Sequence, residues 1–70
     1  MNRICVTSSN IGSVGYNPFT GTLEIQFLNG RIYEYVDVPA AIYDGLMNAG
    51  SHGKFFHIFI RSAYPFRRIQ

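Results

Sequence analysis

Two segments of alternating side chains enclose a short turn in the middle of the chain, and they restrict the fold more than any other feature. Residues 22–27 and 31–36 both alternate with period two, and Asn29-Gly30 lies between them. Alternating segments that enclose a turn containing Asn and Gly are typical of a β-hairpin. The sequence therefore predicts an antiparallel pair of strands at the centre of the fold.

The turn admits two registers, which differ in where they place Glu34. A two-residue turn at 29–30 puts the Glu34 carboxylate on the apolar face, whereas a three-residue loop at 28–30, with Gly30 in the left-handed region, puts it on the other face opposite Glu24. Like charges across a solvated strand pair cost about 0.2–1 kcal/mol, but an unpaired carboxylate in a core costs several kcal/mol. The three-residue loop is therefore predicted. In this register the inner face carries Leu23, Ile25, Phe27, Tyr33 and Tyr35.

The remaining elements are one more strand and two helices. Residues 11–16 predict a strand, whose two glycines mark a bulge or a close backbone approach. Apolar residues at helical spacing predict one helix over residues 40–49 and a second over residues 51–63, with Ser51 as the N-cap of the second. The helices are expected to cover the inner face of the sheet with Ile42, Leu46, Phe56, Phe59 and Ile60.

Together these elements predict an α+β fold, a three-stranded antiparallel β-meander followed by two short helices packed on one face (β-β-β-α-α). The expected organisation is a loose N-terminal leader at residues 1–8, a single domain at residues 9–66 and a short basic tail at residues 67–70. The alternation of Ile4 and Val6 leaves a short extra strand in the leader as an alternative.

Composition restricts the class of protein. Aromatic residues outnumber charged ones, eleven against ten in 70 residues, which excludes disorder, and the length leaves room for one small domain. The single cysteine, Cys5, excludes an internal disulfide and a zinc site built from cysteines. Because neither a signal-peptide pattern nor an apolar run of membrane length is present, a cytoplasmic protein without a membrane partner is expected.

Charge is distributed unevenly along the chain. Residues 1–44 carry a net charge of −2, whereas residues 45–70 carry four cations and no acid. Such asymmetry favours an anionic partner for the C-terminal third. A solvated, mildly basic surface that binds nothing is the alternative, and composition does not separate the two.

Residue types used in catalysis are present, but not at catalytic spacing. His52 and His57 are five residues apart and therefore lie on different sides of a helix, unlike helical zinc ligands. Glutamates on a flat, solvated strand face lack the cleft that acid–base chemistry needs. Ser51 is not part of a nucleophile elbow. We expect no catalytic residues, no metal site, no cofactor and no enzyme activity.

The start of the second helix is a candidate anion site. Ser51, His52, Gly53 and Lys54 combine backbone N–H groups, a hydroxyl, an imidazole and an ammonium, which suits a phosphate or a carboxylate. The helix dipole disfavours a cation in the first turn. The presence of Lys54 there therefore favours a role in binding an anion. The alternative is that the helix starts later and Lys54 is an ordinary loop residue.

A larger candidate surface follows the outer side of the second helix into the tail. RNA-binding surfaces use cations for phosphates and exposed aromatic rings for unstacked bases. Residues of both kinds alternate here, although basic stripes also occur on helices that bind nothing. The candidate nucleic-acid-binding residues are Lys54, His57, Arg61, Tyr64, Arg67 and Arg68.

Several of these segments occur in an order and spacing that point to a known family. They are residues 22–27, Asn29-Gly30, Tyr33-Glu34-Tyr35, Val38-Pro39, residues 49–53, Phe55-Phe56, Ile60-Arg61 and Tyr64. Over roughly residues 8–69 the chain resembles the KTSC domain, named after the C-terminal extension of some lysyl-tRNA synthetases. The resemblance implies no reaction or cofactor, and the link to a synthetase implies RNA binding. This sequence departs from the family pattern at His57, where Asn is expected, and at Ile58, where a polar residue is expected.

Two functions follow as expectations. The first is a non-catalytic module that binds RNA such as tRNA through the basic and aromatic helix face, with an affinity that falls with salt and is lost when Arg61 and Arg67 are both changed to Glu. The second is a protein-interaction module of bacterial or phage origin, which contacts a protein partner or a second copy of itself through Ile58. Salt would not weaken that association.

Overall fold

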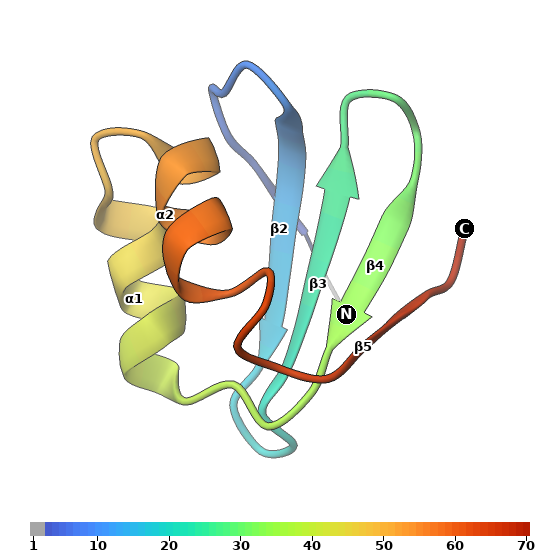
Figure 1. Ribbon diagram of the computed structural model, residues 1–70, viewed down its shortest axis with the longest axis vertical. Coiled ribbons are helices and arrows are strands. Elements are labelled where there is room, and N and C mark those ends of the chain that lie inside the picture. The colour runs from blue at the N-terminus through green and yellow to red at the C-terminus, as the bar shows by residue number, and fades with distance from the viewer. Residues whose placement is uncertain (1–2) are drawn as a thin grey trace.

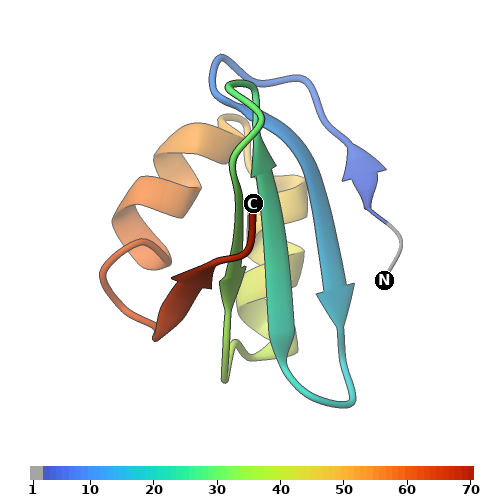
Figure 2. The same ribbon diagram turned by 90° about the vertical axis from the view of Figure 1, so that its right-hand side faces the viewer.

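The computed structural model describes residues 3–70, which form one antiparallel sheet with two helices on one of its faces (Figure 1, Figure 2). The five strands lie in sequence order, β1-β2-β3-β4-β5, and each is antiparallel to its neighbours. In chain order the elements are β1 (Ile4–Cys5), β2 (Ile11–Asn17), β3 (Thr22–Phe27), β4 (Ile32–Tyr35), α1 (Ala40–Asn48), α2 (His52–Phe59) and β5 (Phe66–Arg68).

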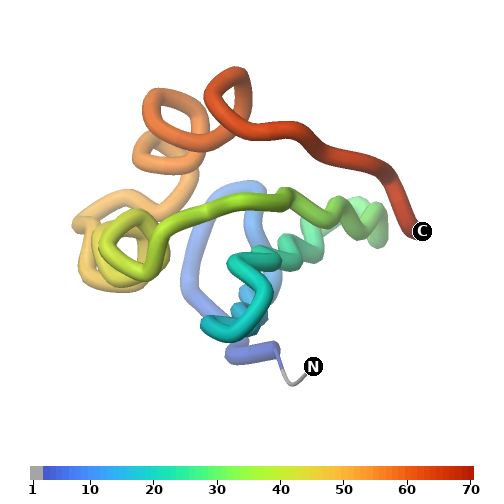
Figure 3. Tube along the Cα trace, turned by 90° about the horizontal axis from the view of Figure 1, so that it is seen from below, coloured from blue at the N-terminus to red at the C-terminus, as the bar shows by residue number. Residues whose placement is uncertain are grey.

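The predicted α+β class is confirmed, but the sheet has five strands where three were predicted. The predicted meander is β2-β3-β4, and the expected leader and tail add one strand at each edge, so the two ends of the chain lie at opposite edges of the sheet (Figure 3). Strand β1 lies where the alternation of Ile4 and Val6 left a short extra strand as an alternative, whereas the three-residue strand β5 was not predicted. Residues 1 and 2 of the expected leader lie outside the described residues.

Strand β5 exists because the outer edge of β4 offers it backbone partners. The Ile32 N–H donates to the carbonyl of Gln70 at 2.8 Å, the Ile69 N–H donates to the carbonyl of Ile32 at 2.8 Å, and the Val36 N–H donates to that of Pro65 at 3.0 Å. These bonds join residues 29 to 38 positions apart in the sequence. Such long-range pairing is not encoded in the local pattern of the tail.

The predicted hairpin register is confirmed. Leu23 pairs with Tyr35 and Glu24 with Glu34, and the Phe27 N–H donates to the carbonyl of Arg31 at 2.8 Å across a loop over residues 28–30. Gly30 has a φ of 90° there, as the three-residue loop requires. The register shift between Ile11 and Ser13 likewise confirms the bulge predicted in the preceding strand, β2.

The two facing glutamates are neutralised by arginines from the two ends of the chain. Arg3, which precedes β1, forms an ion pair with Glu24. Arg67, from β5, lies with its Nε 3.3 Å from Oε1 of Glu34. The two edge segments of the sheet therefore supply the charges that offset the repulsion predicted for this register.

Helix α2 ends at Phe59, earlier than the predicted limit at residue 63. The Arg61 N–H donates to the carbonyl of Phe56 at 2.9 Å, five residues back, so the last turn widens and the α-helix ends there. Ile60 is fully buried as predicted, but Phe59 is 48% exposed rather than part of the core. Its ring packs instead on Phe55, with centroids 4.6 Å apart.

The core lies between the sheet and the helices. Tyr43 of α1 stacks on Tyr16 of β2 with ring centroids 4.7 Å apart. Phe56 of α2 meets Phe27 and Tyr35 edge to face at 5.4 and 5.5 Å. The buried cluster consists of Ile11, Val14, Leu23, Ile25, Tyr35, Val38, Leu46, Phe56 and Ile60. No helix in the described part of the chain is both long and apolar enough to span a membrane.

Candidate nucleic-acid interface

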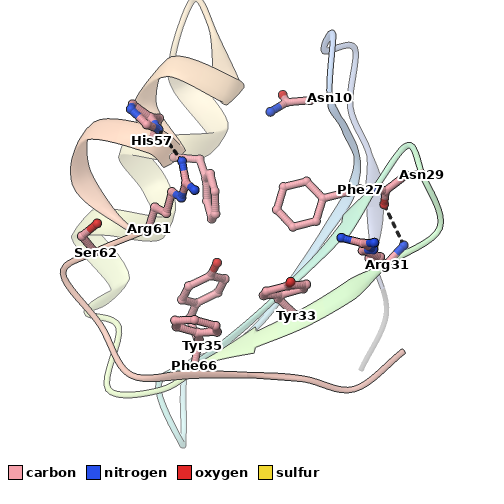
Figure 4. Close-up of a pocket in the computed structure, with 11 residues that line it drawn as sticks. Asn10, Phe27, Asn29, Arg31, Tyr33, Tyr35, His57, Arg61, Ser62 and Phe66 are labelled. Carbon is pink, nitrogen blue, oxygen red and sulfur yellow. Dashed lines mark hydrogen bonds between the residues drawn. The ribbon is translucent and has the colours of Figure 1, made fainter.

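Part of the inner sheet face remains uncovered by the helices, and an open cavity of about 580 Å³ lies there, between α2, the β3–β4 hairpin and β5 (Figure 4). Strands β3 and β4 contribute aromatic rings to it, α2 and the turn after it contribute polar groups, and β5 closes one side. The lining residues are Asn10, Phe27, Asn29, Arg31, Tyr33, Tyr35, Phe56, His57, Arg61, Ser62 and Phe66.

Aromatic rings form the floor of this cavity. Tyr33 stacks on Phe66 with ring centroids 5.7 Å apart and planes inclined by 20°, and it meets Phe27 edge to face at 5.7 Å. Tyr33 and Phe66 point to the same side because Phe66 pairs with Tyr35, two residues along β4, and side chains alternate along a strand. Phe66 is 55% exposed, so this floor presents aromatic surface to solvent.

Cationic groups border the floor on two sides. Arg61 follows α2, and its Nη1 lies 3.3 Å from Nδ1 of His57, one turn earlier. Arg31 lies across the floor, next to the hairpin loop (Figure 4). The described residues that line the cavity include no Asp or Glu. Two guanidinium groups therefore give the cavity a positive potential that no carboxylate in its lining offsets.

The hydroxyl of a largely buried tyrosine also reaches this cavity. Tyr35 is 2% exposed, yet its hydroxyl points toward the centre of the cavity (Figure 4), and no residue among 3–70 hydrogen-bonds to it. Burial raises the pKa of Tyr35 to about 12, with a further rise from Tyr33 and a partial offset from the Arg61 charge. At neutral pH the group is therefore a protonated donor available to a ligand.

The structure places the six predicted nucleic-acid-binding residues on more than one surface. His57 and Arg61 line the cavity together, whereas Lys54 lies beyond His57 along α2 and lines a neighbouring hollow. Arg68 pairs with Tyr33 and so lies on the helix side of β5. Arg67 lies on the opposite face of the sheet, paired with Glu34.

Tyr64, the aromatic member of the predicted set, is half-buried and packs against the core. It does not line the cavity. The aromatic surface beside Arg61 comes from the sheet instead, from Phe27, Tyr33 and Phe66.

Of the four predicted anion-binding residues, His52 is separated from the other three. The Ser51 hydroxyl caps α2 as predicted, accepting a hydrogen bond from the Lys54 N–H at 3.3 Å. Nδ1 of His52 lies 2.8 Å from the carbonyl oxygen of Leu46, so this imidazole closes the end of α1. Gly53 lies so near Asn10 that a Cβ there would come within 2.6 Å of the amide oxygen.

A second hollow, of about 640 Å³, lies over the start of α2. Three of the four predicted anion-binding residues line it, and His52 does not. Its lining is Ser9, Asn10, Ser51, Gly53, Lys54, His57 and Ile58. Ile58, the expected protein contact, is 68% exposed.

The sequence analysis did not name Arg31 as a binding residue, although the predicted hairpin register determines its position. With Phe27 opposite Arg31, the Arg31 side chain belongs to the inner face beside Tyr33, where a cation next to rings is a binding signal. Phe66 could not be placed in this way, because its position depends on the pairing of β5 with β4.

Comparison with known proteins agrees with this fold. The KTSC domain family matches residues 7–64. A crystal structure of a KTSC domain protein from Yersinia pestis superposes with a TM-score of 0.96 at 39% identity, covering 99% of this chain and 97% of that one. An uncharacterised protein from Stutzerimonas stutzeri is 36% identical over 70 residues, 99% of each chain.

A longer relative carries the same domain as a small part of its length. The lysine–tRNA ligase of Nostoc sp. is 39% identical over 61 residues, which are 87% of this chain but only 11% of the ligase. The match over residues 7–64 and the full-length relatives together establish the family, so this chain belongs to the KTSC domain family.

Proposed function

We propose that the protein is a small, non-catalytic module that binds RNA through the face formed by α2, the β3–β4 hairpin and β5. The observation that carries this proposal is the cavity beside α2, where exposed aromatic rings and two guanidinium groups meet without a carboxylate in the lining. Phosphates attract guanidinium groups, and unstacked bases stack on aromatic rings, so RNA supplies both complementary groups.

Charge separation across the sheet supports this choice of face. The ion pairs among residues 3–70 involve Arg3 and Arg67, and both lie with the glutamates on the outer face of the sheet. The other four cations, Arg31, Lys54, Arg61 and Arg68, belong to neither pair. An anionic polymer that reached the helix side would therefore meet cations that no carboxylate neutralises.

The relative from Nostoc sp. supports RNA as the polymer. That protein is a lysine–tRNA ligase, and it carries a segment 39% identical to this chain. A domain joined to an enzyme that handles tRNA is well placed to contact tRNA. We extend this role to the present chain as part of the proposal.

The test is a titration of the purified protein with bulk tRNA at two salt concentrations. Binding should weaken steeply as salt rises, because each phosphate contact releases counterions. The mass of the protein in solution should be measured in the same buffers. An affinity that does not change with salt, or the absence of binding at low salt, would contradict the proposal.

Exposed apolar residues on α2 favour a second candidate, a protein-interaction module. Ile58 is 68% exposed and its neighbour Phe59 is 48% exposed. Helix α2 therefore presents an apolar patch close in sequence to the cations Lys54 and Arg61. A second copy of the chain or another protein would cover this patch, and its binding would not weaken with salt. A solution mass above that of the 7.9 kDa monomer that Ile58→Lys returns to the monomer value would support this candidate.

A further inference from the structure

We infer that the cavity beside α2 holds one unpaired nucleotide of a single-stranded RNA, with its base against Tyr33 and Phe66 and its backbone phosphates near Arg61 and Arg31. This inference rests on the proposed function, RNA binding. It adds that the RNA is single-stranded and that one of its nucleotides occupies the cavity beside α2. RNA bound only through its phosphates would need neither the aromatic floor nor the Tyr35 hydroxyl.

The size and surface of the cavity fit a nucleotide. Its volume of about 580 Å³ falls within the range of about 300–1,000 Å³ that holds small ligands. The rings of Tyr33 and Phe66 are nearly parallel, with planes inclined by 20° and centroids 5.7 Å apart, and both line the cavity. A planar base can lie against these rings, whereas a base inside a duplex is stacked on its neighbours and cannot reach them.

The Tyr35 hydroxyl supplies the second, independent observation. The residue is 2% exposed, and its hydroxyl points into the cavity without a hydrogen-bond partner among residues 3–70 (Figure 4). No buried polar side-chain atom among residues 3–70 lacks a partner, so this hydroxyl oxygen is reached from the open cavity and is free to bond a ligand there. A carbonyl or ring nitrogen of the base would accept a hydrogen bond from this hydroxyl, and Ser62, also in the lining, adds a second polar group.

The positions of the cations give the strand a path. Arg61 and Arg31 lie on opposite sides of the aromatic floor (Figure 4), and a nucleotide within a strand has one phosphate on each side of its base. The strand would therefore run across the cavity, from α2 toward the hairpin loop. Arg67, on the other face of the sheet, takes no part in this path.

The experiment compares a ten-nucleotide oligouridine with a ten-base-pair RNA duplex, both labelled with fluorescein, by fluorescence anisotropy in one low-salt buffer. Two variants address the cavity. Phe66→Leu removes half of the stacking surface, and Tyr35→Phe removes the hydroxyl while retaining the ring. The matched controls are Phe19→Leu, at a residue 96% exposed in the β2–β3 turn, and Tyr43→Phe, on α1 outside the cavity.

We expect the oligouridine to bind more tightly than the duplex. Phe66→Leu should weaken oligouridine binding about tenfold, and Tyr35→Phe should weaken it about threefold to tenfold, while both controls bind as the parent protein does. Thermal melts would show that the variants are folded. A parallel NMR titration with uridine 5′-monophosphate should shift the resonances of Tyr33 and Phe66.

The outcomes separate the inference from the proposed function. If duplex and single strand bind equally and neither cavity variant weakens them, the nucleotide site is refuted and RNA binding stands. If uridine monophosphate shifts the cavity resonances but neither RNA binds, the nucleotide site stands and the RNA function is refuted. If no ligand binds, both are refuted.

Discussion

Charge reversal at Arg61 and at Arg67 should have opposite consequences, although the two residues are close in the sequence. Arg67 pairs with Glu34 on the outer face of the sheet, at 3.3 Å. Arg61 lies on the other face, in the cavity, where it contacts His57. Arg67→Glu should therefore lower stability and leave RNA binding unchanged, whereas Arg61→Glu should weaken RNA binding and leave stability unchanged.

The expected loss of stability follows from the local charges. The Arg67 side chain is 75% exposed, so losing its ion pair costs at most about 1 kcal/mol. A glutamate at this position would face Glu34 across β4 and β5, and like charges on facing residues cost about 0.2–1 kcal/mol more. A total near 1 kcal/mol lowers the melting temperature of a domain of this size by about 4–8 °C.

The expected loss of affinity follows from the cavity. Arg61→Glu removes one of its two guanidinium groups and places a carboxylate among residues that include none. A lost phosphate contact lowers the slope of log affinity against log salt by about one, and a phosphate beside a new carboxylate is repelled. We expect at least about tenfold weaker binding at low salt.

Thermal melts and tRNA titrations at two salt concentrations would measure both effects. Arg3→Glu is the matched control, because Arg3 pairs with Glu24 on the same outer face as Arg67; it should lower the melting temperature and leave the affinity unchanged. Equal loss of tRNA binding in Arg67→Glu and Arg61→Glu would refute the assignment of binding to the helix side.

Three further predictions concern the folded state. Gly30→Ala should lower the free energy of unfolding by about 1 kcal/mol because Gly30 has a φ of 90°, while Gly50→Ala, where a Cβ meets nothing within 4 Å, should leave it within about 0.5 kcal/mol. Urea denaturation measures both. Ser51→Ala should cost about 1 kcal/mol by removing the α2 cap, and Ser51→Asp should restore it. The free energy of unfolding should also fall as pH rises from about 10 to about 12, because Tyr35 stays protonated in the folded protein after it ionises in the unfolded chain; Tyr35→Phe should reduce this fall in denaturation curves across that pH range.

The elements predicted correctly are those held by interactions between near neighbours. The hairpin register follows from local alternation and from the high cost of burying Glu34 unpaired, and it is the observed register. Helix α1 follows from apolar spacing and ends one residue before the predicted limit. Each of these depends on residues within about ten positions of one another.

The features that were missed are strand β5 and the end of α2. Strand β5 exists through backbone bonds from Ile32 and Val36 to the last residues of the chain, and no local pattern in Phe66–Arg68 indicates them. The end of α2 at Phe59 carries no Gly or Pro signal. The deciding partners of β5 lie on another element, whereas α2 ends through the local bond from the Arg61 N–H to the Phe56 carbonyl, which the residue types of the segment do not indicate.

The residues of the candidate site differ in the same way: those on one helix could be placed from the local sequence, and those on β5 could not. The stripe predicted from helical spacing brought together His57 and Arg61 correctly, since both follow from one element. The larger candidate surface also included Arg67, which lies on the other face of the sheet because the chain enters β5, where alternate residues face opposite sides. The same alternation brings Phe66 to the cavity, so one short strand both removes a predicted cation from the site and adds an aromatic ring to it.

The pairing of Glu24 with Glu34 has a consequence for function as well as for the fold. Two carboxylates side by side on the outer face need cations to offset their repulsion, and Arg3 and Arg67 supply them from the two ends of the chain. This arrangement places two of the four acids of the chain on the face away from the cavity. Because the outer face is locally neutral, the net charge of +2 belongs to the rest of the chain, where Arg31 and Arg61 meet no carboxylate among the described residues of the cavity lining. The register that keeps Glu34 out of the core therefore also places Glu24 and Glu34 on the face of the sheet opposite the cavity to which we assign RNA binding.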